Sequence, residues 1–134
     1  MKHLILAISL FSSLSSFAQE FGAPGLCAVA YNKADPMLTR SLTFANGNSV
    51  TNLNAIPLSP ELGSWDNKVT KVDVARGCTF IGYQYQNFGI DYNTGKIIGF
   101  VSTLENNTTA PIRSFFLTNT AYDNKFSSAK CFCL

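Results

Sequence analysis

The sequence predicts an all-β domain, and two observations support this fold class. Short runs of β-branched and aromatic residues alternate with polar ones, and clusters of Asn, Gly, Asp and Pro separate the runs. No long stretch places apolar residues at helical spacing. A series of short strands divided by turn residues is typical of a β-sandwich or barrel.

Six segments have the composition of strands. They are residues 28–31, 41–44, 71–74, 79–83, 96–101 and 113–117. Asn46-Gly47 and Thr94-Gly95 are turn dipeptides. Residues 54–63 contain Pro57 and Pro60, which predicts a loop between strands.

The N-terminal residues have the features of a secretory leader. Lys2 and His3 precede an apolar run over residues 4–14, and Ser16-Phe17-Ala18 offers small residues where a signal peptidase cleaves. The run is shorter than the ~20 residues that a membrane-spanning helix needs. We therefore expect a signal peptide over residues 1–18, and a secreted single domain over residues 19–134 with no membrane span.

Removal of this leader would limit the available chemistry. His3 is the only histidine in the chain, so the expected mature domain has no imidazole for a catalytic triad or a metal site. Basic residues are scattered and the formal net charge is only +2, which argues against nucleic acid as a partner. Carboxylates are few, and only a pair such as Asp91 and Glu105 stays open as a catalytic arrangement. The sequence predicts a protein that is not an enzyme.

Four cysteines, Cys27, Cys78, Cys131 and Cys133, predict two disulfides in an oxidising compartment. One residue separates Cys131 from Cys133, so in an extended segment their side chains point to opposite sides and a bond between them would be strained. Two pairings remain, and both tie a C-terminal tail (residues 119–134) to Cys27 and Cys78.

A weak internal repeat divides the chain into two halves. Val69, Val72 and Val74 have the spacing of Ile112, Phe115 and Leu117. Val29 and Tyr31 follow Cys27 much as Ile81 and Tyr83 follow Cys78. The repeat predicts that Val69, Val72, Val74, Ile112, Phe115 and Leu117 point into one shared core.

The central stretch resembles the βγ-crystallin family. Residues 63–74 are similar to the end of a Greek-key motif of that family, and residues 77–89 are similar to the opening of the next motif. Tyr83 and Phe88 take the two aromatic places, and Gly89 comes one residue earlier than the family glycine. In the first motif Pro36 stands where the second aromatic belongs.

The resemblance implies two Greek-key motifs packed as a β-sandwich, with motif one at about 26–76 and motif two at about 77–118. It also implies a calcium site, because Asp66, Asn67 and Thr70 match the family's motif, although Lys71 replaces its last serine. The carbonyl of Gln84 is the additional ligand that the family pattern suggests. Residues 109–114 of the second half lack the acidic or amide positions, so one weakly bound calcium ion is expected. The alternative is that Asp66 and Asn67 only form a turn.

Several further residues are candidates for packing, binding or modification. Trp65 is expected to pack, and Tyr83 and Phe88 are expected to brace a folded hairpin, which leaves Tyr85 and Tyr92 available to a sugar or a protein. Asn106 and Asn107 begin two overlapping glycosylation sequons.

These observations predict a secreted, monomeric, non-enzymatic binding protein that acts on another organism as an antimicrobial, toxin-like or effector protein. Its target would be a protein or a cell surface of unknown identity. One alternative is a proteinase inhibitor that presents the loop at residues 54–63, and another is a calcium-binding structural, stress or coat protein.

Overall fold

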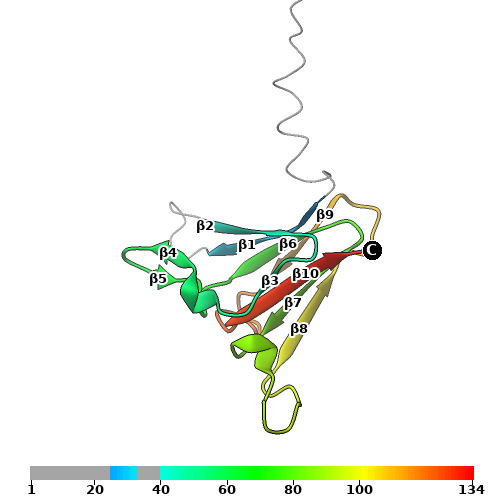
Figure 1. Cartoon of the computed structure of the whole chain (residues 1–134). Coiled ribbons are helices and arrows are strands. Elements are labelled where there is room, and N and C mark those ends of the chain that lie inside the picture. The colour runs from blue at the N-terminus through cyan, green and yellow to red at the C-terminus, as the bar shows by residue number, and fades with distance from the viewer. Residues whose placement is uncertain (1–24, 33–39) are drawn as a thin grey trace, which may run out of the picture.

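The computed structural model describes residues 25–32 and 40–134, in which two four-stranded antiparallel sheets face each other (Figure 1). One sheet has the order β2-β1-β6-β9, the other has the order β3-β10-β7-β8, and β4 and β5 form a separate hairpin. The strands are β1 (Leu26–Asn32), β2 (Arg40–Ala45), β3 (Ser49–Val50), β4 (Pro57–Ser59), β5 (Gly63–Ser64), β6 (Lys71–Ala75), β7 (Cys78–Tyr83), β8 (Val101–Glu105), β9 (Ile112–Phe116) and β10 (Ser128–Cys133). Two 3₁₀ turns, η1 (Leu53–Ala55) and η2 (Asn87–Gly89), complete the described elements.

The strand order contains two intertwined Greek keys. In the first motif β6 lies beside β1, β1 lies beside β2, and the third strand, β3, crosses to the other sheet. In the second motif β10, β7 and β8 have the same arrangement, and the third strand, β9, crosses back. The predicted fold class, two Greek-key motifs packed as a disulfide-stabilised β-sandwich, is confirmed.

Backbone hydrogen bonds show how the two motifs correspond. The N–H of Thr70 donates to the carbonyl of Tyr31 at 2.9 Å, and the N–H of Ser127 donates to the carbonyl of Tyr83 at 2.9 Å. Leu117 N–H donates to Thr70 O, and Leu53 N–H donates to Ser127 O, both at 2.9 Å. Tyr31, Thr70 and Leu53 therefore have Tyr83, Ser127 and Leu117 as their counterparts.

The core lies between the sheets and is built on aromatic rings. Phe44 and Phe80 meet edge-to-face with ring centroids 5.2 Å apart, and Phe126 packs against Phe80 at 6.1 Å. Four of the six predicted core residues are buried: Val69, Val72, Val74 and Leu117. Phe115 is partly buried and packs against the same cluster.

The prediction is wrong for Ile112, which lies opposite Ala75 and outside the core cluster. Side chains alternate across a strand, so Phe115 opposite Val72 faces inward while Ile112 shares the outer face with Ser114. The proposed repeat of these segments is also wrong. Residues 69–74 and 112–117 are not counterparts, because β6 and β9 are antiparallel neighbours in one sheet. The counterpart of β6 is β10.

Two segments differ from their predicted roles. Residues 96–100 are not a strand, because Gly99 has φ +75° and β8 begins only at Val101. Residues 119–134 are more than a tail tied by disulfides, because β10 lies between β3 and β7 and is the fourth strand of motif two (Figure 1). Motif two therefore extends to Cys133, beyond the boundary near residue 118 that the sequence suggested.

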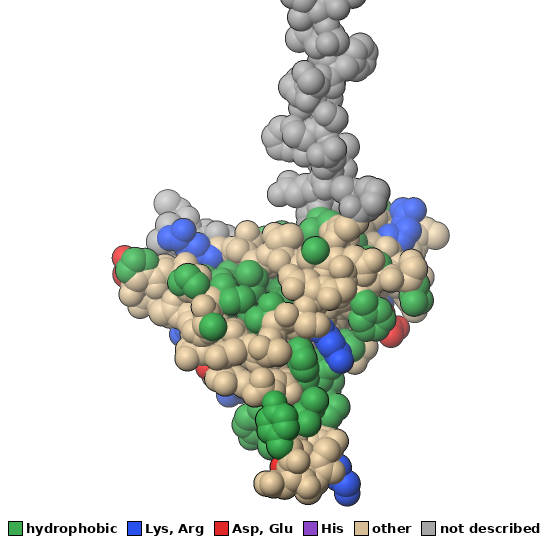
Figure 2. Space-filling model, viewed as in Figure 1, with side chains coloured by type: hydrophobic (Ala, Val, Ile, Leu, Met, Phe, Trp, Pro, Cys, Tyr) green, Lys and Arg blue, Asp and Glu red, His purple; other side chains and the backbone are tan. Residues whose placement is uncertain are grey.

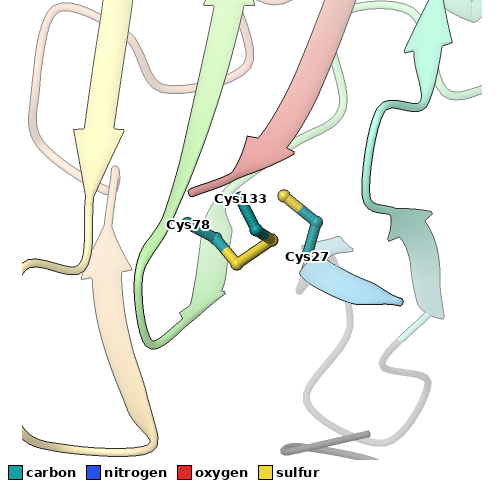
Figure 3. A group of neighbouring side chains, drawn as sticks. All are labelled: Cys27, Cys78 and Cys133. Atoms are coloured by element: carbon teal, nitrogen blue, oxygen red, sulfur yellow. A yellow bond between two sulfur atoms is a disulfide. The ribbon is translucent and has the colours of Figure 1, made fainter. Parts of the chain in front are cut away.

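Two disulfides lie at one end of the sandwich, one between the two sheets and one between neighbouring strands of a single sheet. Cys27 of β1 bonds Cys131 of β10, and Cys78 of β7 bonds Cys133 of β10. This confirms that both C-terminal cysteines pair with Cys27 and Cys78. The sulfurs of Cys27, Cys78 and Cys133 all lie within 4.8 Å of one another, so the two bonds are adjacent (Figure 3).

Among the described residues we find no helix with the length and apolar character needed to cross a membrane.

Candidate functional site

Two turns of the same sequence lead into the last strand of each motif. Asp66-Asn67-Lys68 precedes β6, and Asp123-Asn124-Lys125 precedes β10. Asn67 has φ 55° and Asn124 has φ 53°, the left-handed conformation that asparagine tolerates better than most side chains. Each turn continues into a buried apolar residue and then a hydroxyl residue, with Val69 and Thr70 in one and Phe126 and Ser127 in the other.

The two turns are held by each other. The N–H of Asn67 donates to the carbonyl of Phe126 at 2.9 Å, and the N–H of Asn124 donates to the carbonyl of Val69 at 3.1 Å. Each asparagine therefore bonds the apolar residue of the opposite turn. This reciprocal pair of bonds places the two turns side by side, each with a carboxylate one residue earlier.

The carboxylates of these turns each leave one buried oxygen without a partner. Oδ1 of Asp66 and Oδ1 of Asp123 are the buried side-chain polar atoms of the described residues that have no hydrogen bond. A buried oxygen that loses water without gaining a partner is costly, and more so when the group is charged. The two oxygens therefore occupy equivalent positions in the two turns.

The donor set suits calcium better than a softer metal. Calcium binds carboxylate, hydroxyl and carbonyl oxygens. The hydroxyl of Thr70 donates to Tyr31 O at 3.2 Å. Ser127 is buried at the same position of the second turn. The residues present therefore fit a calcium ion at either turn, although one carboxylate per turn predicts weak binding.

Gln84, the backbone ligand suggested from the sequence, lies next to the second turn. Tyr83, the residue before it, accepts from Ser127 N–H at 2.9 Å. The side-chain oxygen of Gln84 accepts from Phe100 N–H at 3.2 Å. No described hydrogen bond joins Gln84 to Asp66 or Asn67, so the structure does not bring the four predicted ligands together through direct bonds.

The sequence interpretation missed the second turn. It compared residues 66–71 with residues 109–114, but those residues lead into and form β9, the third strand of motif two. The counterpart is residues 123–128, which carry an acidic residue, an asparagine and two serines in the order of the calcium motif. The repeated Asp-Asn-Lys after an aromatic residue, Trp65 or Tyr122, was the signal that could have located it.

The last residue of the motif is Lys71 in the first turn and Ser128 in the second, and the two have different roles. Ser128 accepts from Phe88 N–H at 3.0 Å and donates to Tyr85 O at 2.6 Å, so its hydroxyl fixes the hairpin after β7. Tyr83 and Phe88 meet edge-to-face across this hairpin with centroids 5.3 Å apart, which agrees with their predicted bracing role. Lys71, at the first motif's position, instead pairs with Asp73 at 3.2 Å.

The remaining aromatic candidates are placed as the sequence suggested. Trp65 is only 3% exposed and belongs to the core cluster. Tyr85 is 47% exposed and Tyr92 is 81% exposed, both on the long β7–β8 loop. Figure 2 shows hydrophobic side chains gathered around this projecting loop, below the body of the sandwich.

The two sequons have different surroundings. Asn106 is 1% exposed, and its Nδ2 donates to Val74 O at 3.0 Å and to Ala110 O at 3.2 Å. Asn107 is exposed. A glycan replaces a hydrogen on Nδ2, so only Asn107 could carry one in the folded chain.

The remaining candidates, the inhibitory loop and a carboxylate pair, lack supporting contacts. Residues 54–63 include the last residues of η1 and most of the β4–β5 hairpin. Leu58 of this segment is buried in the core cluster. Asp91 accepts from Asn93 N–H at 2.9 Å and from the Thr94 hydroxyl at 3.0 Å, which caps a turn. No described contact joins Asp91 to Glu105.

Comparisons with known proteins include a likeness to a solved structure. No family model matches the chain, and no curated protein matches it. A solved structure, a double mutant of a βγ-crystallin domain from Clostridium beijerinckii, is similar over 79% of this chain and 96% of that chain, with 20% sequence identity and a TM-score of 0.46.

Proposed function

We propose that this chain is an extracellular, non-enzymatic binding domain that holds one calcium ion at each of its two Asp-Asn-Lys turns. The single observation that supports this proposal is the pair of buried, unpartnered carboxylate oxygens, Asp66 Oδ1 and Asp123 Oδ1. The sequence alone suggested one ion, and the second turn raises the number to two.

The proposed ligands follow from the chemistry of each turn. Asp66 and Asp123 supply the charged oxygen, Thr70 and Ser127 supply hydroxyls, and backbone carbonyls near the turns, that of Gln84 among them, complete the set. Because each turn contributes one carboxylate, we expect dissociation constants toward the millimolar range typical of extracellular calcium modules.

Isothermal titration calorimetry with calcium chloride tests the proposal. The wild type should bind two ions, Asp66→Asn and Asp123→Asn one each, and the double variant none. Glu61→Gln removes the same charge from an exposed residue outside both turns and should still bind two. The proposal would be refuted if the wild type bound no calcium at a calcium concentration about ten times the expected dissociation constant. It would also be refuted if neither Asp→Asn change reduced calcium binding.

The extracellular location rests on the leader-like N-terminal sequence and is supported by the two disulfides, which persist in oxidising compartments. The antimicrobial or effector role and the inhibitor role stay predictions from the sequence. The calcium-binding alternative is the one that a structural observation favours.

A further inference from the structure

A groove opens between the edges of the two sheets, at β8 of one sheet and β9 of the other. Its volume is about 520 Å³, within the range of sites that bind small molecules or peptide segments. Its lining includes Ser102 and Leu104 from β8, Phe115 from β9, and Leu117 and Tyr122 from the connection that follows. None of the residues that line it carries a charge.

The β8 wall of the groove has backbone groups directed away from its own sheet. Asn106 N–H bonds Cys78 O and Gln84 N–H bonds Phe100 O, which fixes the alternation of hydrogen bonds between β7 and β8. Ser102 and Leu104 therefore bond β7, while Val101 and Thr103 point their N–H and C=O groups outward. The next outward carbonyl, Glu105 O, accepts from Arg113 Nη1 at 3.0 Å, as this alternation requires.

The β9 wall has the same property. Arg76 N–H bonds Pro111 O and Leu117 N–H bonds Thr70 O, so Arg113 and Phe115 bond β6 and Ser114 faces outward. A strand added beside β8 would continue that sheet, with the β9 edge lying across the groove from it.

The first motif has a longer chain segment at the corresponding point of its sequence. Leu53 and Trp65 of that motif correspond to Leu117 and Tyr122 of the second, but residues 54–64 separate the first pair and only residues 118–121 separate the second. The extra residues of the first motif form the β4–β5 hairpin, whose Ile56 and Leu58 join Trp65 in the apolar cluster. Trp65 is buried, whereas Tyr122 is only half-buried.

We propose that the β8–β9 groove binds an extended, uncharged peptide segment of another protein, with aliphatic side chains at alternate positions. Charge complementarity supports this occupant, because a charged side chain inserted among uncharged lining residues would lose water without gaining a partner. The chain's own Ile56 and Leu58, two residues apart, are the internal example of this pattern. The binding mode is addition of a strand to an exposed sheet edge.

The test uses the full mature chain and a blocked seven-residue peptide of alternating threonine and isoleucine, with a control peptide of the same composition whose isoleucines are grouped. Amide hydrogen exchange followed by NMR is expected to show added protection at Val101 and Thr103 with the alternating peptide. The amides of Ser102 and Leu104, already bonded to β7, are expected not to change.

A variant pair tests the same contact by affinity. Thr103→Pro removes an outward N–H on an edge strand, where proline is tolerated, and is expected to weaken binding about tenfold. Thr43→Pro is the matched control, since Thr43 opposite Val29 occupies on β2 the place that Thr103 opposite Ile81 occupies on β8. It is expected to leave the affinity within about twofold.

The hydrogen-exchange result on the wild type decides the matter even if a proline variant does not fold. The proposal is overturned by equal binding of both peptides, or by no binding at millimolar peptide. It is also overturned by protection centred on the Tyr85–Tyr92 loop, or by protection of the β8 amides through self-association without peptide.

Discussion

The backbone nitrogen of Asn67 lies 2.9 Å from the carbonyl oxygen of Phe126. The turn before β6 in motif one is therefore held by the turn before β10 in motif two. The reciprocal bond runs from Asn124 to Val69. Each turn also carries a carboxylate with one buried oxygen that has no partner. Cation binding at either turn should therefore stabilise both motifs at once.

Asn106 is expected to be a structural residue. Its side-chain amide bonds Val74 O and Ala110 O, and its Oδ1 accepts from Thr108. Asn106→Ala leaves buried carbonyls unpaired and should lower the free energy of unfolding by about 2–3 kcal/mol. Chemical denaturation measures this change, and Asn107→Ala, at the exposed neighbour, is the control expected within about 0.5 kcal/mol of wild type. Equal stability of the two variants would contradict this role.

The difference between these asparagines also predicts glycan occupancy. In a eukaryotic secretory host, one glycan at most should be found on this loop, attached to Asn107. Asn107→Gln should abolish it in peptide mass spectrometry. A folded, secreted product with its glycan on Asn106 would show that the hydrogen bonds of Asn106 are dispensable.

Gly82 is expected to be required for the packing of Phe126. A Cβ built on Gly82 would lie 2.6 Å from two ring carbons of Phe126, and Gly82 has ordinary backbone dihedral angles, so the cost of a side chain is steric. Gly82→Ala should destabilise the domain by about 1–3 kcal/mol. Combining it with Phe126→Leu, which shortens the opposing side chain, should cost less than the sum of the single changes, as a double-mutant cycle would measure. Strict additivity would contradict a direct clash.

The two disulfides are expected to differ in accessibility. Cys27 and Cys131 are at most 1% exposed, whereas Cys133 is partly exposed near the C-terminus. Limited phosphine treatment of the folded protein should reduce Cys78–Cys133 first, as differential alkylation and mass spectrometry would detect. Each bond closes a long loop of 104 or 55 residues, so its loss should cost roughly 4–5 kcal/mol by chain entropy. Preferential reduction of Cys27–Cys131 would contradict the burial argument.

The sequence was informative where a local pattern decides the structure. Strands β1, β2, β6, β7 and β9 have period-two or β-branched patterns and were found, and elimination of a Cys131–Cys133 bond restricted the disulfides correctly. It failed at β10, because Ser128–Cys133 has small and polar residues that become buried only between two neighbouring strands. It also failed for the pairing of the halves, since valine spacing alone cannot separate a sheet neighbour from a symmetry counterpart.

The Asp-Asn-Lys turns show the same limit. The sequence pattern singled out Asp66, Asn67 and Thr70 but not Asp123, because apolar spacing alone pointed to residues 109–114 as the counterpart. The unpartnered state of both Oδ1 atoms depends on contacts between distant parts of the chain, so no local pattern could report it.

Thermal unfolding with and without calcium tests the central claim most directly. For the wild type, calcium at ten times its dissociation constant should add about 1.4 kcal/mol per site, a rise in Tm of roughly 4–8 °C for each. In chelator, Asp66→Asn and Asp123→Asn should melt at or above the wild-type temperature, because each removes a charge beside an unpartnered buried oxygen. In calcium the order should reverse, and Glu61→Gln should follow the wild type in both. An equal Tm of the wild type with and without calcium, or carboxylate variants that are less stable in chelator, would contradict the account.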